Sequence, residues 1–466
     1  LPSDSTTGDT RYYAKFTHNQ RFDEHWTGGF NLERVSDDKY FSEMATRIVV
    51  TSRVNLPQRA FLNYQDENLT FNGIVEKIQN LDNLSFVYQR LPQLTMSYQN
   101  EWNGVQAQAT GQFVNFSALS AAGKVPEGSR LTFYPSAAYP IKTSYGYITP
   151  KFGVHATQYS LQNNTPTGYT GEYNQLQRTV PIFSLDTGMY FDREASLFDT
   201  HYTNTLEPRI FYEYAPYRDQ SKFPVFDTSL ATLNQESLFL ENQYFGQDRI
   251  NNANQVSLAM TSRLIDKDTG IERISATVGQ RIYFDDLKVG LPGTTLNSRK
   301  TSDFIAGFSA RLSSRLNLDT FWQYDPDQRN MERSNFLIRY NPEPGKSFNF
   351  GYRYTAAVLE QIDTSAQWPL GNRWYAIGRM NYSIRDGNAV QSLAGLEYDA
   401  GCWLGRFVMQ RVQTATANAN YAMFFQLELG GLTSIGANPL NIVKRNIPSY
   451  MNTENIPVIY REQNTQ

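Results

Sequence analysis

The stretch SFNFGYRYTA, residues Ser347 to Ala356, alternates aromatic with polar or small side chains at every second position. Successive side chains of a β-strand point to opposite faces, so one face of this segment is aromatic and the other is polar. A single strand of this kind fits any half-buried sheet. The same pattern recurs along most of the chain with no helical periodicity between the repeats, and this recurrence restricts the fold class.

The other alternating runs are roughly 9–12 residues long, the length of a tilted strand that crosses a bilayer. In the C-terminal half they are Arg273–Phe284, Phe304–Ser313, Leu316–Asp325, Asn335–Tyr340 and Arg373–Ile384. In the N-terminal half they are Arg11–Phe22, His25–Val35, Gln58–Gln65, Leu69–Ile78, Gln93–Glu101, Val105–Phe116, Lys151–Leu161, Pro181–Phe191 and Thr205–Tyr214.

The breaks between runs are short and rich in turn-forming residues, as in Asp325-Pro326-Asp327 and Asp386-Gly387-Asn388. Short breaks predict antiparallel neighbours in a meander. Pro135 and Pro140 interrupt one further candidate strand, where we expect a bulge or a strand end. Alternation is missing over 216–249 and after Leu432, so we expect a long loop within a barrel over 1–432 and an extended tail over 433–466.

These runs predict an all-β chain, a large antiparallel transmembrane β-barrel of about two dozen strands. Closure explains the pattern best, because an open sheet of that size would leave unpaired edges, and lipid offers no water to satisfy them. Tyr, Phe and Trp on the outer face suit a bilayer boundary. A barrel this wide is not filled by its own side chains, so its polar lumen must hold water, a plug or a partner.

Composition agrees with this interpretation and excludes several classes. The 466 residues are 40% hydrophobic and 14% aromatic, with a formal net charge of −3. The mean hydropathy is −0.51, and no apolar run reaches the roughly 18 residues of a transmembrane helix. The balanced charge gives no nucleic-acid footprint. The chain starts at Leu1 without a signal-peptide pattern, which suggests a fragment or a processed product.

No catalytic, metal or cofactor site is predicted. No G-x-S-x-G nucleophile elbow and no P-loop is present. The acidic pairs Asp37-Asp38 and Asp285-Asp286 are expected in turns. Four histidines lie on separate predicted strands or turns, where ordinary polar roles are expected: His18, His25, His155 and His201.

The single cysteine, Cys402, lies in the sequence Tyr398-Asp399-Ala400-Gly401-Cys402-Trp403 and cannot close a disulfide within this chain. One interpretation is a half-buried thiol with no further role. The other is a disulfide to sequence outside the fragment, which the oxidising periplasm permits.

One segment resembles a known family. It contains Thr205-Leu206-Glu207-Pro208-Arg209, then Ala215-Pro216-Tyr217-Arg218-Asp219-Gln220, Asp248-Arg249-Ile250 and Ala253-Asn254-Gln255-Val256. These uncommon strings, in this order, are similar to the LptD family of lipopolysaccharide-assembly outer-membrane proteins. The similarity extends more weakly through Tyr398–Trp403 and Phe424–Leu432, and so covers most of the chain.

The resemblance implies a bacterial outer-membrane barrel of about 26 strands with a lipoprotein, LptE, as a plug in its lumen. It also implies a periplasmic domain before the barrel that receives lipopolysaccharide from an LptA bridge, and lipid exit between the first and last strands. That domain, and by our reading the first strands, are absent here. Cys402 would then pair with the absent domain.

The last alternating strand is predicted at 421–432. It resembles the terminal barrel strand of the family, which borders the exit and carries the recognition signal for the barrel-assembly machinery. The residues of one parity that we assign to this edge are Tyr421, Met423, Phe425, Leu427 and Leu429.

Three functions are consistent with these observations. The first is a non-enzymatic translocon that inserts lipopolysaccharide into the outer leaflet, with outer-membrane lipids around it and no cofactor. The second, which composition alone favours, is a substrate-specific porin or a plugged uptake barrel. The third, an outer-membrane phospholipase, needs a Ser/His pair on one strand face that we do not find.

Overall fold

Strands dominate the computed structural model of the chain. The structure describes residues 8–41, 54–81, 87–118, 125–197, 200–294, 296, 298–413, 419–429, 433–436, 439–457 and 459–460. All statements on structure below refer to these residues.

The strands have the following bounds: β1 Tyr13–Arg21, β2 Trp26–Val35, β3 Asn55–Gln65, β4 Leu69–Asn80, β5 Gln89–Trp102, β6 Val105–Ser117, β7 Glu127–Ala138, β8 Ile141–Thr143, β9 Gly146–Gln162, β10 Gln175–Met189, β11 Phe191–Leu197, β12 Thr200–Ala215, β13 Ser229–Leu230, β14 Tyr244–Phe245, β15 Ala253–Asp266, β16 Glu272–Tyr283, β17 Phe304–Arg311, β18 Leu316–Asp325, β19 Asn330–Glu343, β20 Lys346–Thr355, β21 Leu359–Gly371, β22 Trp374–Ser383, β23 Asn388–Asp399, β24 Trp403–Gln413, β25 Ala419–Leu429 and β26 Thr433–Gly436. The helical elements are the 3₁₀ turns η1 Ser237–Phe239 and η2 Thr453–Asn455 and the helix α3 Leu440–Asn446.

All strands except β13 and β14 belong to one antiparallel sheet of 24 strands. Pairing follows chain order, as in β1 with β2, β2 with β3 and β24 with β25. Two strands are interrupted: β8 continues the line of β7 beside β9, and β11 continues β10 beside β12. The prediction of a large antiparallel meander is therefore confirmed.

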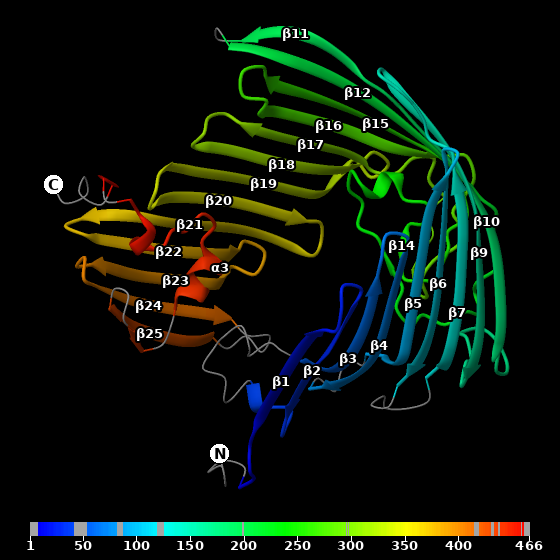
Figure 1. The fold of residues 1–466 in the computed structure, drawn as a ribbon, viewed down its shortest axis with the longest axis horizontal. Helices are drawn as coiled ribbons and strands as arrows, with labels where there is room; N and C mark the ends of the chain where they lie inside the picture. The colour runs from blue at the N-terminus through cyan, green and yellow to red at the C-terminus, as the bar shows by residue number, and fades with distance from the viewer. Residues whose placement is uncertain are drawn as a thin grey trace.

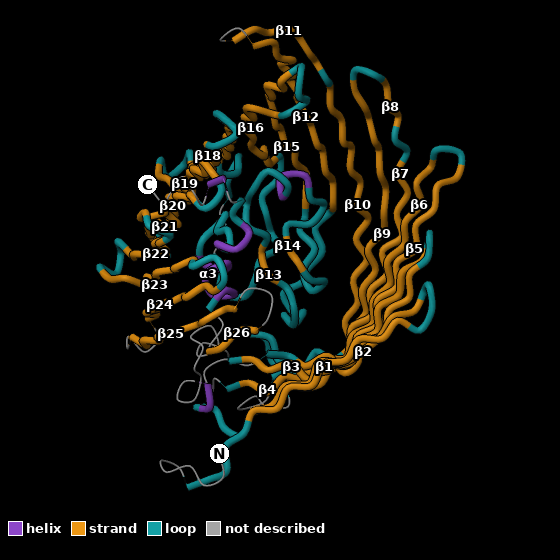
Figure 2. Tube along the Cα trace, turned by 60° about the vertical axis from the view of Figure 1, so that its left-hand side comes forward, coloured by secondary structure: helices purple, strands orange, loops and turns teal. Residues whose placement is uncertain are grey.

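The sheet curves around an interior, as Figures 1 and 2 show. Its ends are β1 and β26, which each pair with one neighbour only, β2 and β25. Among the described residues, no pairing joins β1 to β25 or β26. The curvature expected from the sequence is present, but these two edges do not zip together directly.

The alternation read in the sequence sorts side chains between the two faces of the wall. In β20, Ser347 and Asn349 are buried on the inner face, whereas Phe348 is exposed on the outer face. The aromatic parity therefore points outward, as predicted, and the polar parity points into the lumen. A strand with this pattern is stable only where its two faces meet different surroundings.

Proline acts more gently than expected near residue 135. Pro135 lies within β7, and the pairs Phe133–Ala156 and Ser136–Gly153 keep one register around it, so no bulge forms. The two pairs between them are missing, because proline has no amide hydrogen to donate to the ladder. The strand end expected near Pro140 is present, since β7 stops at Ala138.

The connections alternate between two ends of the wall. The short-turn end carries connections of five residues or fewer throughout: 22–25, 66–68, 103–104, 144–145, 198–199, 267–271, 312–315, 344–345, 372–373, 400–402 and 430–432. The opposite, long-loop end carries 36–54, 81–88, 118–126, 163–174, 216–252 and 284–303, besides some shorter ones. This asymmetry gives the sheet a direction.

Two segments lie inside the curve of the sheet (Figures 1 and 2). The first, here called the luminal loop, is 216–252; it contains β13, η1 and β14. The second, here called the C-terminal segment, is 439–457. Instead of the extended tail expected after residue 432, β26 pairs with β25 and α3 follows. No helix among the described residues has the length and apolar character to cross a membrane.

Phe350 tests which face meets lipid. It lies on the outer face of β20, and its ring packs edge-on against Phe336 of the neighbouring strand at 6.4 Å. We expect Phe350→Arg to destabilise the barrel by about 2–4 kcal/mol in a refolding titration in lipid. The matched change on the inner face, Gly351→Arg, should cost little, because its side chain enters the lumen. Equal costs for both would contradict this placement.

Candidate functional site: the luminal wall and its two docked segments

Asp248 is the centre of the contacts that hold the luminal loop against the wall. Its carboxylate accepts hydrogen bonds from Arg130 of β7 at 2.6 Å and from the hydroxyl of Tyr159 of β9 at 2.9 Å. It also accepts from the backbone N–H groups of Phe226 at 2.7 Å and Asp227 at 3.1 Å. Wall and loop therefore share one buried carboxylate.

Two further arginines extend this attachment. Arg178 of β10 donates to the backbone carbonyls of Gln247 at 2.8 Å and Asp248 at 2.9 Å. Arg249, from the loop itself, donates to the carbonyls of Phe223 at 2.8 Å and Pro224 at 3.0 Å. Each of these side chains is buried. Buried guanidinium groups need such partners, since an unpaired one would be strongly destabilising.

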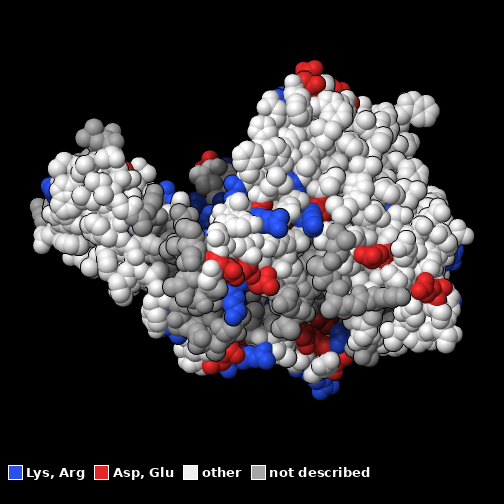
Figure 3. All heavy atoms as spheres, turned by 90° about the horizontal axis from the view of Figure 1, so that it is seen from below, with Lys and Arg blue, Asp and Glu red and all other residues white. Residues whose placement is uncertain are grey.

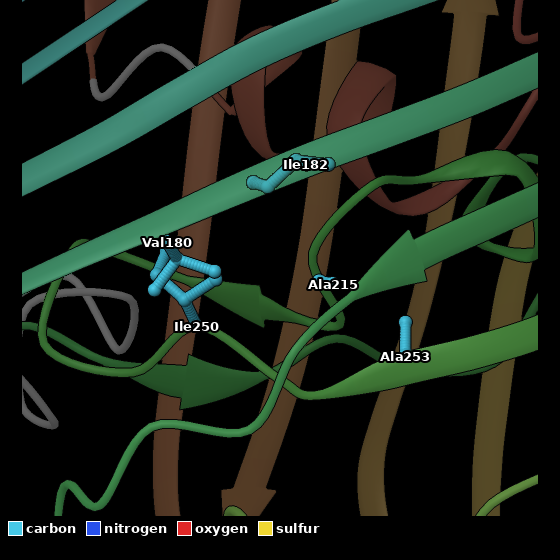
Figure 4. Packing of buried hydrophobic residues seen from close by; sticks show 5 residues of the cluster. All are labelled: Val180, Ile182, Ala215, Ile250 and Ala253. Carbon is cyan, nitrogen blue, oxygen red and sulfur yellow. The ribbon is translucent and has the colours of Figure 1, made fainter.

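A small apolar cluster closes the base of the luminal loop. Figure 4 shows Val180 and Ile182 of β10, with Val180 against Ile250 at the end of the loop. Ala215 and Ala253, which end β12 and begin β15, complete the cluster. The loop therefore leaves and re-enters the wall at one packed point on the inner face.

The tip of the loop reaches further along the wall. Glu241 accepts hydrogen bonds from Tyr134 at 2.7 Å, Lys151 at 2.9 Å and Ser184 at 2.7 Å. The ring of Phe239 lies 3.8 Å from the guanidinium of Arg209. These contacts tie the loop to β7, β9, β10 and β12 together, so it is part of the wall and not a free extracellular strand.

Asp248 stays ionised despite its burial. Burial alone would raise the pKa of this carboxyl, but Arg130 and the N–H groups of Phe226 and Asp227 outweigh that effect and hold the pKa below its ordinary value. The stabilisation from a carboxylate with a lowered pKa is complete above the unfolded value, and it is lost as the pH falls through the folded value.

The C-terminal segment covers a different part of the lumen. Val443 and Ile447, from α3 and its end, pack against Ile377, Leu393 and Val408 on the inner faces of β22, β23 and β24. This apolar contact explains why a polar barrel wall carries buried aliphatic residues here: they form a small core with the segment and are not exposed to luminal water.

Hydrogen bonds fix the same segment in register. Gln367 of β21 pairs with both backbone groups of Met451, at 2.7 and 2.9 Å. Arg406 of β24 donates to Glu397 at 2.5 Å and to Asn452 at 2.9 Å. Glu397 also accepts from the hydroxyl of Tyr450 at 2.5 Å. Arg406 and Glu397 are both fully buried, so neither tolerates loss of its partner.

Gly345 shows how closely the segment approaches the short-turn end. This glycine has φ +80°, and a Cβ there would lie 2.5 Å from the side chain of Ile456. A side chain at position 345 is thus excluded twice, by backbone conformation and by space.

The outer surface contrasts with this interior. Large apolar side chains are exposed along most strands, among them Phe152, Phe183, Phe348 and Phe407. On the face drawn in Figure 3, broad areas carry no Lys, Arg, Asp or Glu, and the charged groups gather mainly near the middle and the lower rim. Exposed apolar area of this extent marks a surface that meets another apolar phase.

Cys402, the disulfide candidate, is a free, exposed thiol in the turn between β23 and β24, at the short-turn end. Gly401 before it has φ +90°, which the tight turn requires. The position leaves the sulfur accessible to a partner outside the described residues. Its pairing stays a prediction.

The five residues assigned to the terminal strand lie in β25. Tyr421, Met423 and Phe425 are 71%, 67% and 60% exposed, well above the roughly 40% of many outward-facing side chains elsewhere. Leu427 and Leu429 are half-buried, and here β26 adds a short partner. Residues 430–432, the end of the predicted strand, lie outside the described residues.

The histidines are separate, as expected from the sequence. His18, His25 and His201 lie on β1, before β2 and on β12. His155 of β9 is buried and contacts Gln247 of the luminal loop at 2.7 Å. Within the described part of the chain, no three His, Cys, Asp or Glu side chains are placed to hold a metal ion.

Sequence reasoning missed the residues that hold the lumen together. Arg130, Arg178, Arg281 and Arg406 all lie on the inner parity of predicted or unrecognised strands and are buried. Arginine within a strand of otherwise small polar residues was a usable signal, because a lumen-facing arginine free in water needs no particular position. The partners, such as Asp248, are too distant in sequence to be deduced.

Comparison with known proteins identifies the family. The family model described as LptD, LPS transport system D, matches residues 9–374. The chain belongs to the LptD family. This is a transport family and not an enzyme family, and the chain is a protein of the bacterial outer membrane.

Curated LptD relatives agree over nearly the whole chain. The LPS-assembly protein LptD of Aromatoleum aromaticum is 42% identical over 453 residues, covering 97% of this chain and 57% of the relative. That of an Azoarcus species is 40% identical, covering 97% and 56%. The chain thus spans somewhat more than half the length of these LptD proteins.

Solved structures are more distant than these LptD relatives. The siderophore receptor PirA from Acinetobacter baumannii aligns at 7% identity with a TM-score of 0.36 to 0.37 among such receptors, PirA itself at 0.37, covering 91% of this chain and 72% of the receptor.

Acid should undock the luminal loop only at low pH. We expect the amides of Phe226 and Asp227 to stay protected from hydrogen exchange at pH 5. Protection should then be lost below about pH 3.9, the ordinary aspartate value, as Asp248 protonates. Asp248→Asn should show weak protection at both pH values and no titration. A loss of protection centred above pH 5 in the unchanged protein would contradict this account of Asp248.

The Arg406–Glu397 pair should matter more broken than absent. Arg406→Met alone leaves Glu397 buried without its cation and should destabilise docking of the C-terminal segment by about 3–5 kcal/mol. Adding Glu397→Gln should recover much of that loss. Cleavage of the segment by protease in detergent measures docking. Double and single variants with equal protease sensitivity would refute a coupled pair.

Proposed function

We propose that this chain is the barrel part of an outer-membrane translocon that inserts lipopolysaccharide into the outer leaflet. The observation that carries the proposal is membership of the LPS transport family over residues 9–374, in a sheet whose outer face is apolar and whose inner face is polar. A glycolipid has the same two parts, acyl chains and a sugar headgroup, so it needs both surfaces side by side.

Exit of the lipid is proposed to be lateral, at the seam between the two sheet ends. Opening a wall elsewhere would break a ladder of backbone hydrogen bonds in a medium without water. The β1 and β25–β26 edges pair with one neighbour each, which supports the seam as the weak place. The very exposed Tyr421, Met423 and Phe425 then face the path of the acyl chains.

A lipoprotein of the LptE kind is proposed as the partner in the lumen. The luminal loop and the C-terminal segment occupy parts of the interior, along β7–β16 and β20–β24. The inner face of β1–β4 carries polar side chains, such as Asn63 and Asn72, that are available to such a plug.

The remaining sequence of the full-length protein is proposed to supply the periplasmic domain that meets an LptA-like bridge. Outer-membrane barrels carry their short turns on the periplasmic side, which places the Cys402 turn there. A thiol exposed at that end suits a disulfide to such a domain. The β25 strand is proposed to carry the signal for the barrel-assembly machinery.

Reconstitution tests the main proposal. The full-length protein and its copurifying lipoprotein, in vesicles, should deliver labelled lipopolysaccharide to the outer leaflet in a partner-dependent way. A porin would instead pass small solutes freely once the plug is removed and deliver no lipopolysaccharide. That second result would reject the translocon.

A non-reducing gel tests Cys402. The full-length protein should show a redox-sensitive shift in mobility that Cys402→Ser abolishes. Survival of that shift in the variant would mean that the thiol is not bonded. Copurification of the lipoprotein with both forms serves as the control for folding.

A further inference from the structure

Two cavities lie on the inner wall between the parts covered by the luminal loop and by the C-terminal segment. The first, about 350 Å³, is formed by β16–β19 under the loop residue Gln235. The second, about 680 Å³, lies between the luminal loop, the 284–303 connection and the long-loop ends of β16–β20. Volumes in this range are typical of sites for small molecules or parts of larger ones.

The first cavity has the chemistry of a sugar site. Its walls carry hydroxyl and amide groups, including Ser275 and Asn335, and the ring of Phe321. Asp319, the charged side chain that lines it, is already paired with Arg339 and accepts from Ser309 at 2.8 Å. The cavity therefore offers neutral hydrogen-bonding groups and one aromatic ring, which suit a polyol better than an ion or an acyl chain.

Gly307 leaves the floor of this cavity open. It lies on the inner parity of β17, and a Cβ added there would meet no atom within 4 Å. Asn335 is exposed to the same space, and its side chain is not drawn into the wall. Most polar residues along the inner wall bond to a neighbouring strand, so this uncommitted amide is available to a ligand.

The two cavities adjoin at one residue pair. The guanidinium of Arg333 lies 4.8 Å from the centre of the Phe321 ring, and Arg333 also lines the larger cavity. Its terminal nitrogen donates to the carbonyl of Leu233 in the luminal loop. The two spaces thus follow one line along the wall, from its middle to the long-loop end.

We propose that the cavity around Phe321, Asn335 and Gly307 is a binding subsite for a short stretch of the saccharide of the transported glycolipid. This rests on the proposed function. The luminal loop forms the roof of the subsite through Gln235, and the sugar would move from it along the larger cavity toward the long-loop end. The acyl chains take no part in it.

The test uses the full-length protein in detergent and the fluorescently labelled oligosaccharide released from lipopolysaccharide by mild acid, free of lipid. Fluorescence anisotropy should report saturable binding. Gly307→Trp fills the open floor without a clash and should weaken binding by about tenfold or more. Thr17→Trp, which places the same indole on the inner face of β1 away from the cavity, should leave binding unchanged.

A second variant protects the test against a folding defect. Asn335→Leu keeps the size of the side chain and removes its amide, so affinity should fall several-fold with an unchanged heat-modifiable mobility on a gel. Failure of the unchanged protein to bind the oligosaccharide, or equal binding by Gly307→Trp, would overturn the subsite. Delivery of lipopolysaccharide is measured in parallel: loss of delivery in the unchanged protein would overturn the proposed function instead.

Discussion

Pairing of backbone amides and carbonyls in a medium without water is the constraint on which this structure depends. A sheet meets it by joining each strand to both neighbours, and side chains then alternate between lipid and lumen by geometry alone. Ser347, Phe348, Asn349 and Phe350 record this sorting in four consecutive residues. Everything distinctive about the interior follows, because an enclosed polar surface must find partners for its polar groups.

The lumen meets that requirement by folding parts of the chain back onto the wall. Asp248 joins Arg130 and Tyr159 to the luminal loop, and Arg406 joins Glu397 to the C-terminal segment. These arginines are buried and bound at several points, so they hold a fixed geometry in a way that solvated side chains do not. Between the two docked segments, β17–β19 keep an open inner surface, and the wall there is free to serve a ligand.

The fold class could be predicted from the sequence because its signal is local. Alternation over residues such as Phe304–Ser313 needs no knowledge of distant partners, and most predicted strands lie within a few residues of the observed ones. The interior could not be predicted in the same way. Residues 216–249 read as a loop because they lack alternation, yet Asp248 and Glu241 dock on strands about a hundred residues earlier. The helix after Pro439 was missed because α3 is short, and it packs on β22–β24 through two apolar residues.

The central claim is that one parity of each strand meets lipid and the other meets water. It is tested most directly by single cysteines placed in turn from position 348 to 353, in a Cys402→Ser background, and labelled with a polarity-sensitive fluorophore in vesicles. Quenchers in the lipid phase should act on positions 348, 350 and 352, and a water-soluble quencher should act on 349, 351 and 353. Quenching without a two-residue period, or with the same quencher at all six positions, would contradict the account.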